Sequence, residues 1–132
     1  MNGVKRFVLF LLSVVSCGSA FGQTCTTTIN PGSSVASAVS NAAPGSTVCL
    51  NSGNWGTVPL SGIIKSGFVT IRSTNGVEAS MYLAISGGTQ YVRASNLTIT
   101  GAEINGANTK NISVLNSTFK GGMFINTKDF NN

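Results

Sequence analysis

The sequence has no histidine among its 132 residues, only three acidic residues and only three cysteines. Without histidine, these residues cannot form a Ser-His or Cys-His catalytic arrangement. Glycoside hydrolysis needs paired carboxyl groups, and calcium needs several oxygen ligands, usually carboxylates. The acidic residues, Glu78, Glu103 and Asp129, are far apart in the sequence, although folding can bring distant residues together. No catalytic constellation or metal cluster is therefore evident within these residues.

The sequence also lacks an apolar run long enough to cross a membrane. The longest run, 7–15, is interrupted by one serine and is far shorter than the ~20 residues of a spanning helix. Two basic residues precede it, and Ala20 and Gly22 stand at positions −3 and −1 of a cleavage site. This pattern predicts a signal peptide over residues 1–22 and a secreted, extracellular or periplasmic protein.

A second cleavage site remains open as an alternative. The segment Val14-Val15-Ser16-Cys17 resembles a bacterial lipoprotein box. Cleavage there would leave the protein anchored through a lipid on Cys17 instead of released.

Negatively charged side chains are also scarce. After removal of residues 1–22, six basic side chains face three acidic ones, a net charge of +3. This mild excess is compatible with an acidic polysaccharide partner and equally with an ordinary solvated surface. No cluster of aromatic and basic residues indicates nucleic acid.

Two cysteines remain after signal-peptide cleavage, Cys25 and Cys49. An even pair in an oxidising compartment favours a disulfide. A reactive thiol has no support, because there is no histidine to activate it.

One short helix is expected after Ser34, which is a suitable N-cap, and before Pro44-Gly45, which stops a helix. Four apolar residues share one face of it at helical spacing: Val35, Ala38, Val39 and Ala42. The helix is too short to be stable alone, so it must lie on an apolar surface.

The rest of the chain reads as short strands separated by Gly, Asn, Ser and Thr, which tolerate tight corners. The expected strands are 47–50, 68–72, 82–85, 91–93, 97–100, 112–115 and 123–125.

The segment 96–106 nearly repeats itself as 111–121. Such self-similarity favours coils stacked in parallel, each burying the apolar face of the next. This register would stack like on like, with Ile99 over Val114, Ile104 over Phe119 and Asn96 over Asn111. Because the offset between the two copies is short for a complete coil, either one side is reduced to a corner or the match joins neighbouring sides. The dipeptides Asn75-Gly76 and Asn105-Gly106 leave an antiparallel sandwich with hairpins as the competing all-β arrangement.

Residues 42–50, Ala-Ala-Pro-Gly-Ser-Thr-Val-Cys-Leu, followed by Gly53-Asn54-Trp55, resemble the opening of the pectin-lyase-like right-handed parallel β-helix proteins. Members of that superfamily commonly begin with a capping helix, a strand of the form A-x-P-G-D-T-I-x-L and then G-x-Y. Here Ser46 replaces the frequent Asp, and Trp55 replaces the frequent Tyr. The resemblance implies an all-β, right-handed parallel β-helix with a short N-terminal capping helix. It also implies that a Cys25–Cys49 disulfide joins the cap to the first strand.

Within that superfamily the nearest likeness is to lyases and epimerases of acidic polysaccharides. The resemblance implies a Lys or Arg base that removes a sugar proton, often with calcium beside the sugar carboxylate. The basic candidates in this sequence are Arg72, Arg93, Lys110, Lys120 and Lys128. Trp55 is a candidate for stacking on a sugar, although packing near the first coil is the simpler role.

We therefore expect residues 23–132 to form the N-terminal cap and first coils of a longer β-helix that serve as scaffold. The leading function is that of a secreted lyase or epimerase of an acidic polysaccharide. The alternative is a non-catalytic, adhesin-type surface β-helix that binds glycans or protein partners.

Overall fold

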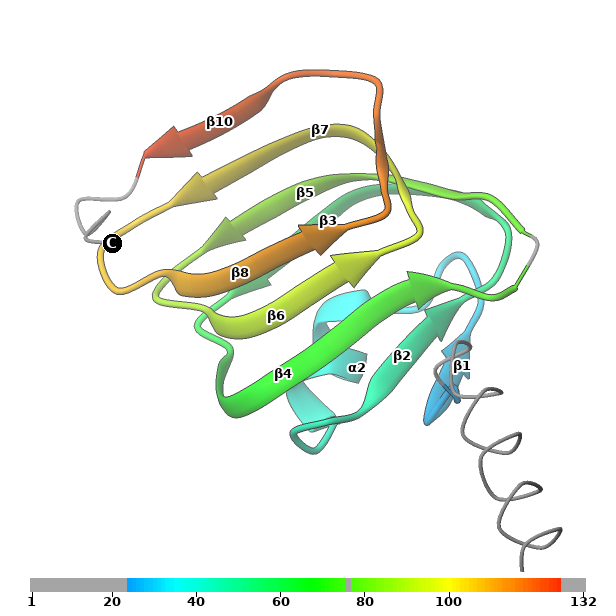
Figure 1. The fold of residues 1–132 in the computed structure, drawn as a ribbon, viewed down its shortest axis with the longest axis horizontal. Helices are drawn as coiled ribbons and strands as arrows, with labels where there is room; N and C mark the ends of the chain where they lie inside the picture. The colour runs from blue at the N-terminus through cyan, green and yellow to red at the C-terminus, as the bar shows by residue number, and fades with distance from the viewer. Residues whose placement is uncertain (1–23, 76, 127–132) are drawn as a thin grey trace, which may run out of the picture.

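The computed structural model describes residues 24–75 and 77–126, so the predicted signal peptide and the alternative lipid site at Cys17 lie outside the described residues. The described chain coils into a parallel β-helix with one short helix (Figure 1), which confirms the expected fold class. Its elements are β1 (Thr27–Ile29), α2 (Val35–Asn41), β2 (Thr47–Leu50), β3 (Gly53–Ser61), β4 (Ile64–Ser73), β5 (Ala79–Ser86), β6 (Gln90–Ser95), β7 (Thr98–Asn105), β8 (Lys110–Leu115), β9 (Thr118–Phe119) and β10 (Met123–Asn126).

The strands form two parallel sheets, and from β2 onward the chain passes from one sheet to the other in every coil. Sheet A has the order β1-β2-β4-β6-β8, and sheet B has the order β3-β5-β7-β10, with β9 also paired to β7. Parallel neighbours need a crossover connection. From β2 onward the strand of the opposite sheet provides it, whereas the connection from β1 to β2 runs through α2. All described strand pairs are parallel, so the antiparallel sandwich considered from the Asn-Gly dipeptides is wrong.

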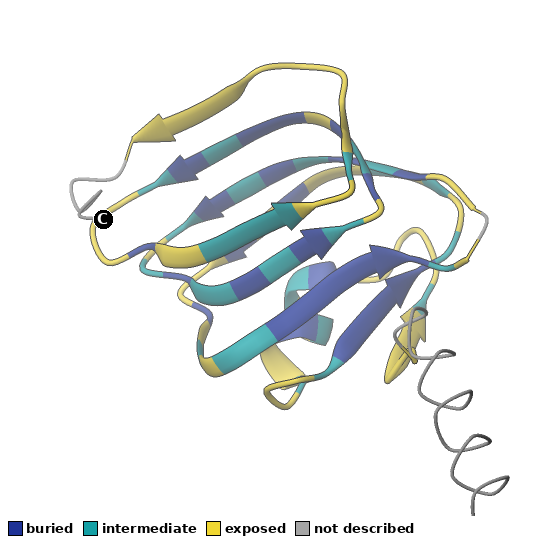
Figure 2. Cartoon of the chain, viewed as in Figure 1, coloured by how far each residue is buried: buried dark blue, intermediate teal, exposed yellow. Residues whose placement is uncertain are grey.

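The hydrophobic core lies between the two sheets, where inward side chains stack in ladders along the coil axis. Figure 2 shows buried residues alternating with less buried ones along the inner strands. In sheet B, Leu60 stacks on Ile85, Ile85 on Ile104 and Ile104 on Ile125. Along β5, inward residues are buried and outward ones are partly exposed in strict alternation, as expected for side chains that alternate across a strand.

The register differs from the one that the near-repeat of 96–106 and 111–121 predicts. Ile99 pairs with Phe119, and Ala94 is the residue that pairs with Val114. The predicted stacking of Ile99 on Val114, Ile104 on Phe119 and Asn96 on Asn111 is therefore wrong.

The coil length explains this difference. A coil must cross both sheets before it returns, so equivalent residues of these coils, such as Leu97 and Ser117, are 20 positions apart. The offset of the near-repeat is shorter than one coil, so the repeat aligns β7 of sheet B with β8, the next strand of sheet A. That is the second arrangement left open by the sequence.

The first coil is covered by α2, as the sequence predicts. The hydroxyl of Ser34 accepts a hydrogen bond from the Ser37 backbone N–H at 3.1 Å, which caps the helix. Val35 and Val39 are buried, while Ala38 and Ala42 pack against the same core.

The Cys25–Cys49 disulfide joins the residues before β1 to β2, with 5.6 Å between the two Cα atoms. The expected covalent link between the N-terminal segment and the first strand is therefore present.

Strand β3 is absent from the sequence prediction, because Gly53, Gly56 and Pro59 make this segment resemble a loop. It is the edge strand of sheet B, where proline is tolerated because one side of the strand needs no backbone donor. Helix α2 lies against it. The ring of Trp55 packs on the core and its indole N–H donates to the Asn51 carbonyl at 3.1 Å, which supports the packing role. The described ranges contain no helix long and apolar enough to cross a membrane.

Candidate functional site

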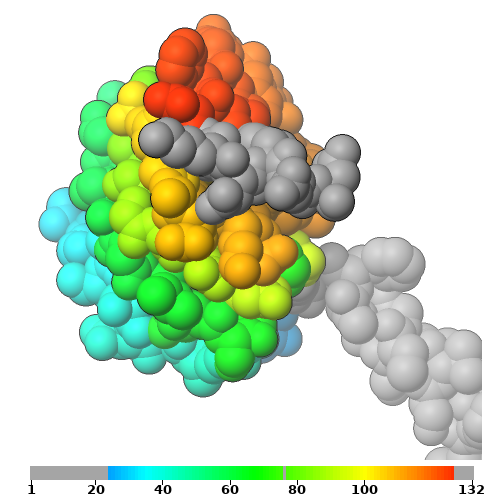
Figure 3. Space-filling view, turned by 90° about the vertical axis from the view of Figure 1, so that its left-hand side faces the viewer, coloured from blue at the N-terminus to red at the C-terminus, as the bar shows by residue number. Residues whose placement is uncertain are grey.

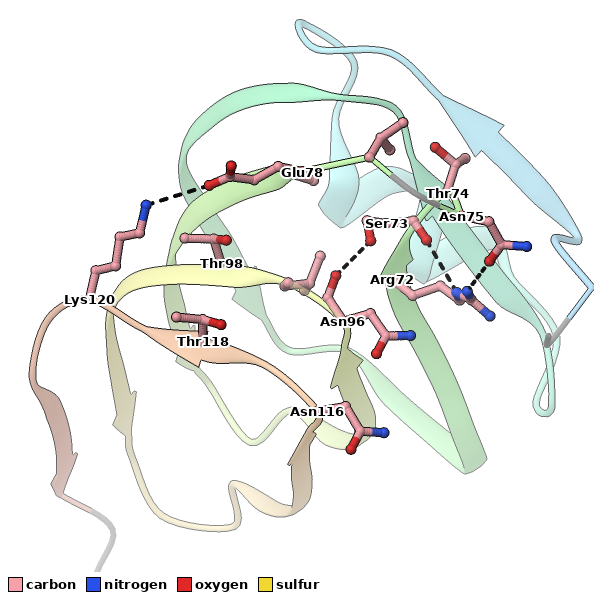
Figure 4. Close-up of a pocket in the computed structure, with 13 residues that line it drawn as sticks. Arg72, Ser73, Thr74, Asn75, Glu78, Asn96, Thr98, Asn116, Thr118 and Lys120 are labelled. Carbon is pink, nitrogen blue, oxygen red and sulfur yellow. Dashed lines mark hydrogen bonds and ion pairs between the residues drawn. The ribbon is translucent and has the colours of Figure 1, made fainter. Parts of the chain in front are cut away.

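A groove of about 610 Å³ lies at the corner where sheet A passes into sheet B (Figure 4). Three successive coils line it, because their corners stack directly on one another. The lining residues are 72–75 and 77–79 from the corner after β4, 96–98 from the corner after β6, and Asn116, Thr118 and Lys120 from the last coil. We call this cavity the corner groove.

One corner is longer than the others and forms a wall of the groove. The connection between β4 and β5 spans 74–78, whereas the connections after β6 and β8 are only 96–97 and 116–117. The longer corner brings Asn75 and Glu78 to the groove (Figure 4).

The two short corners place an asparagine at the same position. Asn96 and Asn116 have φ values of 53° and 47°, in the left-handed region that asparagine tolerates better than most residues. The Asn96 backbone N–H donates to the Leu115 carbonyl at 3.3 Å, so the two corners are held in register. Side-chain amides therefore recur along the groove at the spacing of the strands, about 4.8 Å.

The groove contains two cationic side chains with different environments. Arg72 is buried, and its guanidinium donates to the Ser73 carbonyl and to the side-chain oxygen of Asn75, which fixes its position. Lys120 lies 3.5 Å from the Glu78 carboxylate, and both side chains are more than 60% exposed, at 61% and 64%. An ion pair this exposed contributes less than about 1 kcal/mol, so a polyanion can replace Glu78 as the partner of Lys120.

Outside the groove, Tyr82 and Glu103 form a pair on the outer face of sheet B. The phenol of Tyr82 donates to Glu103 Oε2 at 3.4 Å. Burial and the neighbouring Glu103 carboxylate raise the pKa of Tyr82, so its hydroxyl stays protonated and serves as a donor. Gly101 leaves the space for the ring, because a Cβ there would lie 2.7 Å from it.

The residues present do not fit the calcium ion that the family resemblance implies. Nowhere in 24–75 and 77–126 do three His, Cys, Asp or Glu side chains come together. Glu78 and Glu103 lie in separate places, each with its own partner. Calcium needs six to eight oxygen ligands, so we derive no step that uses it.

The structure separates the basic residues that the sequence proposes. Arg72 and Lys120 both line the corner groove, whereas Arg93 and Lys110 lie on sheet A outside it. Lys128 falls outside the described residues.

Sequence reasoning missed the Glu78–Lys120 ion pair, and it stacked Asn96 on Asn111 where the structure places Asn116 at the equivalent corner. The usable signal was the recurrence of an asparagine before an apolar or hydroxyl residue at Asn96 and Asn116, because that spacing marks the true coil length. The ion pair joins residues 42 positions apart, so it becomes visible only once the register is known.

The comparisons with known proteins give no family assignment: no family model matches the chain, no curated protein matches it, and no solved structure matches it. The resemblance to pectin-lyase-like proteins therefore stays a prediction, and the protein is assigned by its strand pairing as a parallel β-helix.

Proposed function

We propose that the protein is a secreted, carbohydrate-active β-helix of the pectin-lyase-like type that binds an acidic polysaccharide along the corner groove. The observation that carries this proposal is the composition of the groove. Amides and hydroxyls recur from coil to coil, and Arg72 and Lys120 provide positive charge between them. A ligand made of repeating acidic sugars complements such a row of donors and cations.

The most favoured reaction class is that of a lyase or epimerase acting on this polysaccharide. Both reactions remove the proton beside a sugar carboxylate, so the carboxylate must be held by cations while a base acts. Arg72, fixed by its hydrogen bonds, supports the first of these tasks. Lys120 lies beside the Glu78 carboxylate at the edge of the groove, where it can pair with a ligand carboxylate instead. We therefore assign binding and orientation, not the base, to the groove residues.

A non-catalytic, adhesin-type β-helix is the second candidate. The observation that favours it is that Glu78 is the only carboxylate among the lining residues and is already paired with Lys120. The described groove therefore holds no unpaired carboxylate that could act as the base in either reaction.

Binding and reaction are tested separately with protein expressed from the full 132-residue sequence. Affinity electrophoresis in gels containing alginate, pectate or chondroitin measures binding, and ultraviolet absorbance of unsaturated uronates measures elimination. We expect retarded migration with at least one polymer. K120Q should bind about three- to fivefold more weakly, as for loss of one exposed charge contact.

The matched control is K110Q, which removes the same charge from β8 outside the groove and should bind as the wild type does within twofold. Unretarded migration in all three gels would overturn the binding proposal. Retardation without any absorbance increase would exclude elimination and leave the epimerase and the non-catalytic candidate, because epimerisation forms no unsaturated uronate.

A further inference from the structure

Two aromatic rings and a guanidinium form a cluster on sheet A, outside the corner groove. The guanidinium carbon of Arg93 in β6 lies 4.4 Å from the centre of the Phe68 ring in β4, within the range of a cation–π contact. The ring of Tyr91 meets Phe68 edge-on, with 5.5 Å between their centres and 78° between their planes. The Arg93 guanidinium thus packs on the Phe68 ring, and the Phe68 ring packs against the Tyr91 ring.

The cluster lies on the outer side of the sheet. Arg93 pairs in register with Thr70, between the inward residues Val92 and Ala94, which belong to the buried core. Because side chains alternate across a strand, the Arg93 side chain leaves the sheet on the side away from the core.

Arg93 has no acidic partner among the residues that the structure describes. Its Nε–H is buried and lacks a hydrogen-bond acceptor. The two described glutamates are engaged elsewhere, Glu78 with Lys120 and Glu103 with Tyr82. A buried donor without an acceptor is unfavourable, and native proteins rarely keep one without a ligand or a solvent partner.

The backbone of Tyr91 provides a second, independent observation. Its φ is 61°, in the left-handed region, where the next coil has Asn111 with a φ of 55°. Asparagine suits this conformation, whereas a bulky aromatic residue rarely adopts it. Unfavourable backbone of this kind concentrates at functional sites. Tyr91 therefore has a backbone conformation that asparagine adopts more easily. Its ring packs edge-on against Phe68.

The cluster adjoins the corner groove. Arg93 pairs with Thr70, and Arg72 is two residues further along the same strand. The spacing of strands and of residues within a strand places the two arginine Cα atoms roughly 8 Å apart. Arg72 lines the groove, and the Arg93 guanidinium lies over Phe68, further from the groove along the outer face of sheet A.

We propose that Arg93, positioned by Phe68 and Tyr91, binds the carboxylate of a sugar acid in the chain that the corner groove holds. The guanidinium carbon lies over the Phe68 ring, and the planar fork of a guanidinium matches a carboxylate with two parallel hydrogen bonds. This inference rests on the proposed function and names a further contact for the same ligand.

The first test uses the smallest probe. Wild-type protein is titrated with galacturonate while the aromatic NMR signals of Tyr91 and Phe68 are followed, and galactose serves as the neutral control. We expect the ring signals to shift saturably with galacturonate and to stay unchanged with galactose. Equal shifts with both sugars, or no shift with galacturonate, would overturn the proposal.

The second test separates the effect of the planar guanidinium of Arg93 from the effect of its positive charge. R93K keeps the positive charge but loses the planar fork, and its affinity for pectate should fall about tenfold, as for loss of one charge-assisted bidentate contact. K110Q removes a charge from the neighbouring strand and should stay within twofold of the wild type. Binding of pectate by R93K as tight as that of the wild type would show that Arg93 only covers Phe68.

The outcomes distinguish this inference from the proposed function. If K120Q weakens pectate binding and R93K does not, the groove stands and the Arg93 site is overturned. If pectate does not bind while galacturonate still shifts the Tyr91 signals, the Arg93 site stands and the groove proposal is overturned. If R93K does not fold, which circular dichroism detects, the galacturonate titration of the wild type decides.

Discussion

The two ends of the described β-helix have similar strands but opposite surroundings. In one ladder of sheet B the exposed fraction is 0% for Leu60, 2% for Ile85, 9% for Ile104 and 43% for Ile125. These are apolar side chains of similar size at equivalent positions, so their own chemistry does not explain the trend. Burial in a stacked coil is supplied by the coils on both of its sides.

The first coils are covered on their outer side by three separate features. Helix α2 packs its apolar face on the core, and β1 pairs with β2. The Cys25–Cys49 disulfide links the segment before β1 to β2. In the last described coil, by contrast, five large apolar side chains are exposed: Leu115, Phe119, Met123, Phe124 and Ile125. The last strand, β10, is coloured as exposed along its length (Figure 2). The space-filling view shows this last coil forming one end of the stack (Figure 3).

The largest effect should come from removing the covalent link at the covered end. Replacing Cys25 and Cys49 together by serine should lower the free energy of unfolding by about 3.5 kcal/mol, because the unfolded chain loses the constraint on a loop of 24 residues. Urea unfolding followed by circular dichroism measures this difference. A loss below about 1 kcal/mol would mean that α2 and β1 hold the covered end without the disulfide.

The next largest effect should distinguish the two ends of one ladder. L60A should cost about 3 kcal/mol, because it leaves a cavity at a fully buried site. I125A removes a similar group from a half-exposed site and should cost less than about 1 kcal/mol. Equal losses in the same unfolding experiment would show that Ile125 is buried in solution and that the last coil is covered there.

A smaller effect is expected at the cap of α2. S34A removes the hydroxyl that accepts the Ser37 N–H and should cost about 1 kcal/mol. Replacement by aspartate, another good N-cap residue, should restore most of this stability in thermal unfolding. No rescue by aspartate would indicate that the side chain acts through packing instead.

The smallest change in stability, but a clear change in association, should follow substitution in β10, the last described strand. Phe124 is 68% exposed, so F124K should alter the free energy of unfolding by less than about 0.5 kcal/mol. Unpaired strand edges with apolar side chains favour self-association, and a lysine there should reduce it in sedimentation velocity. S37K adds the same charge at the covered end and should leave association unchanged.

Much of the fold is predictable from the sequence because its signals are local. The N-cap Ser34, the stop at Pro44-Gly45 and the apolar face of the helix all belong to one short segment. The register is not local. Strands from both sheets carry the same pattern of apolar residues after an asparagine, so 96–106 matches 111–121 although they belong to different sides of the coil.

The candidate site is less predictable for the same reason. Glu78 and Lys120 meet only because corners two coils apart lie over one another. Arg93 reveals its special position only through Phe68, which lies on the neighbouring strand. Arg72, Arg93 and Lys120 are candidates from the sequence because they are basic residues. Which of them line the same groove depends on the coil length, which the sequence did not reveal.

The long corner over 74–78 has a consequence for how such a protein changes over time. It adds residues between β4 and β5, yet β5 still pairs with β3 and β7 in continuous sheet B. An insertion at a corner therefore lengthens one wall of the groove without disturbing the stacked strands. Ligand preference and foldability are thus separable in this architecture, and the corner after β4 is a natural place to graft new recognition loops.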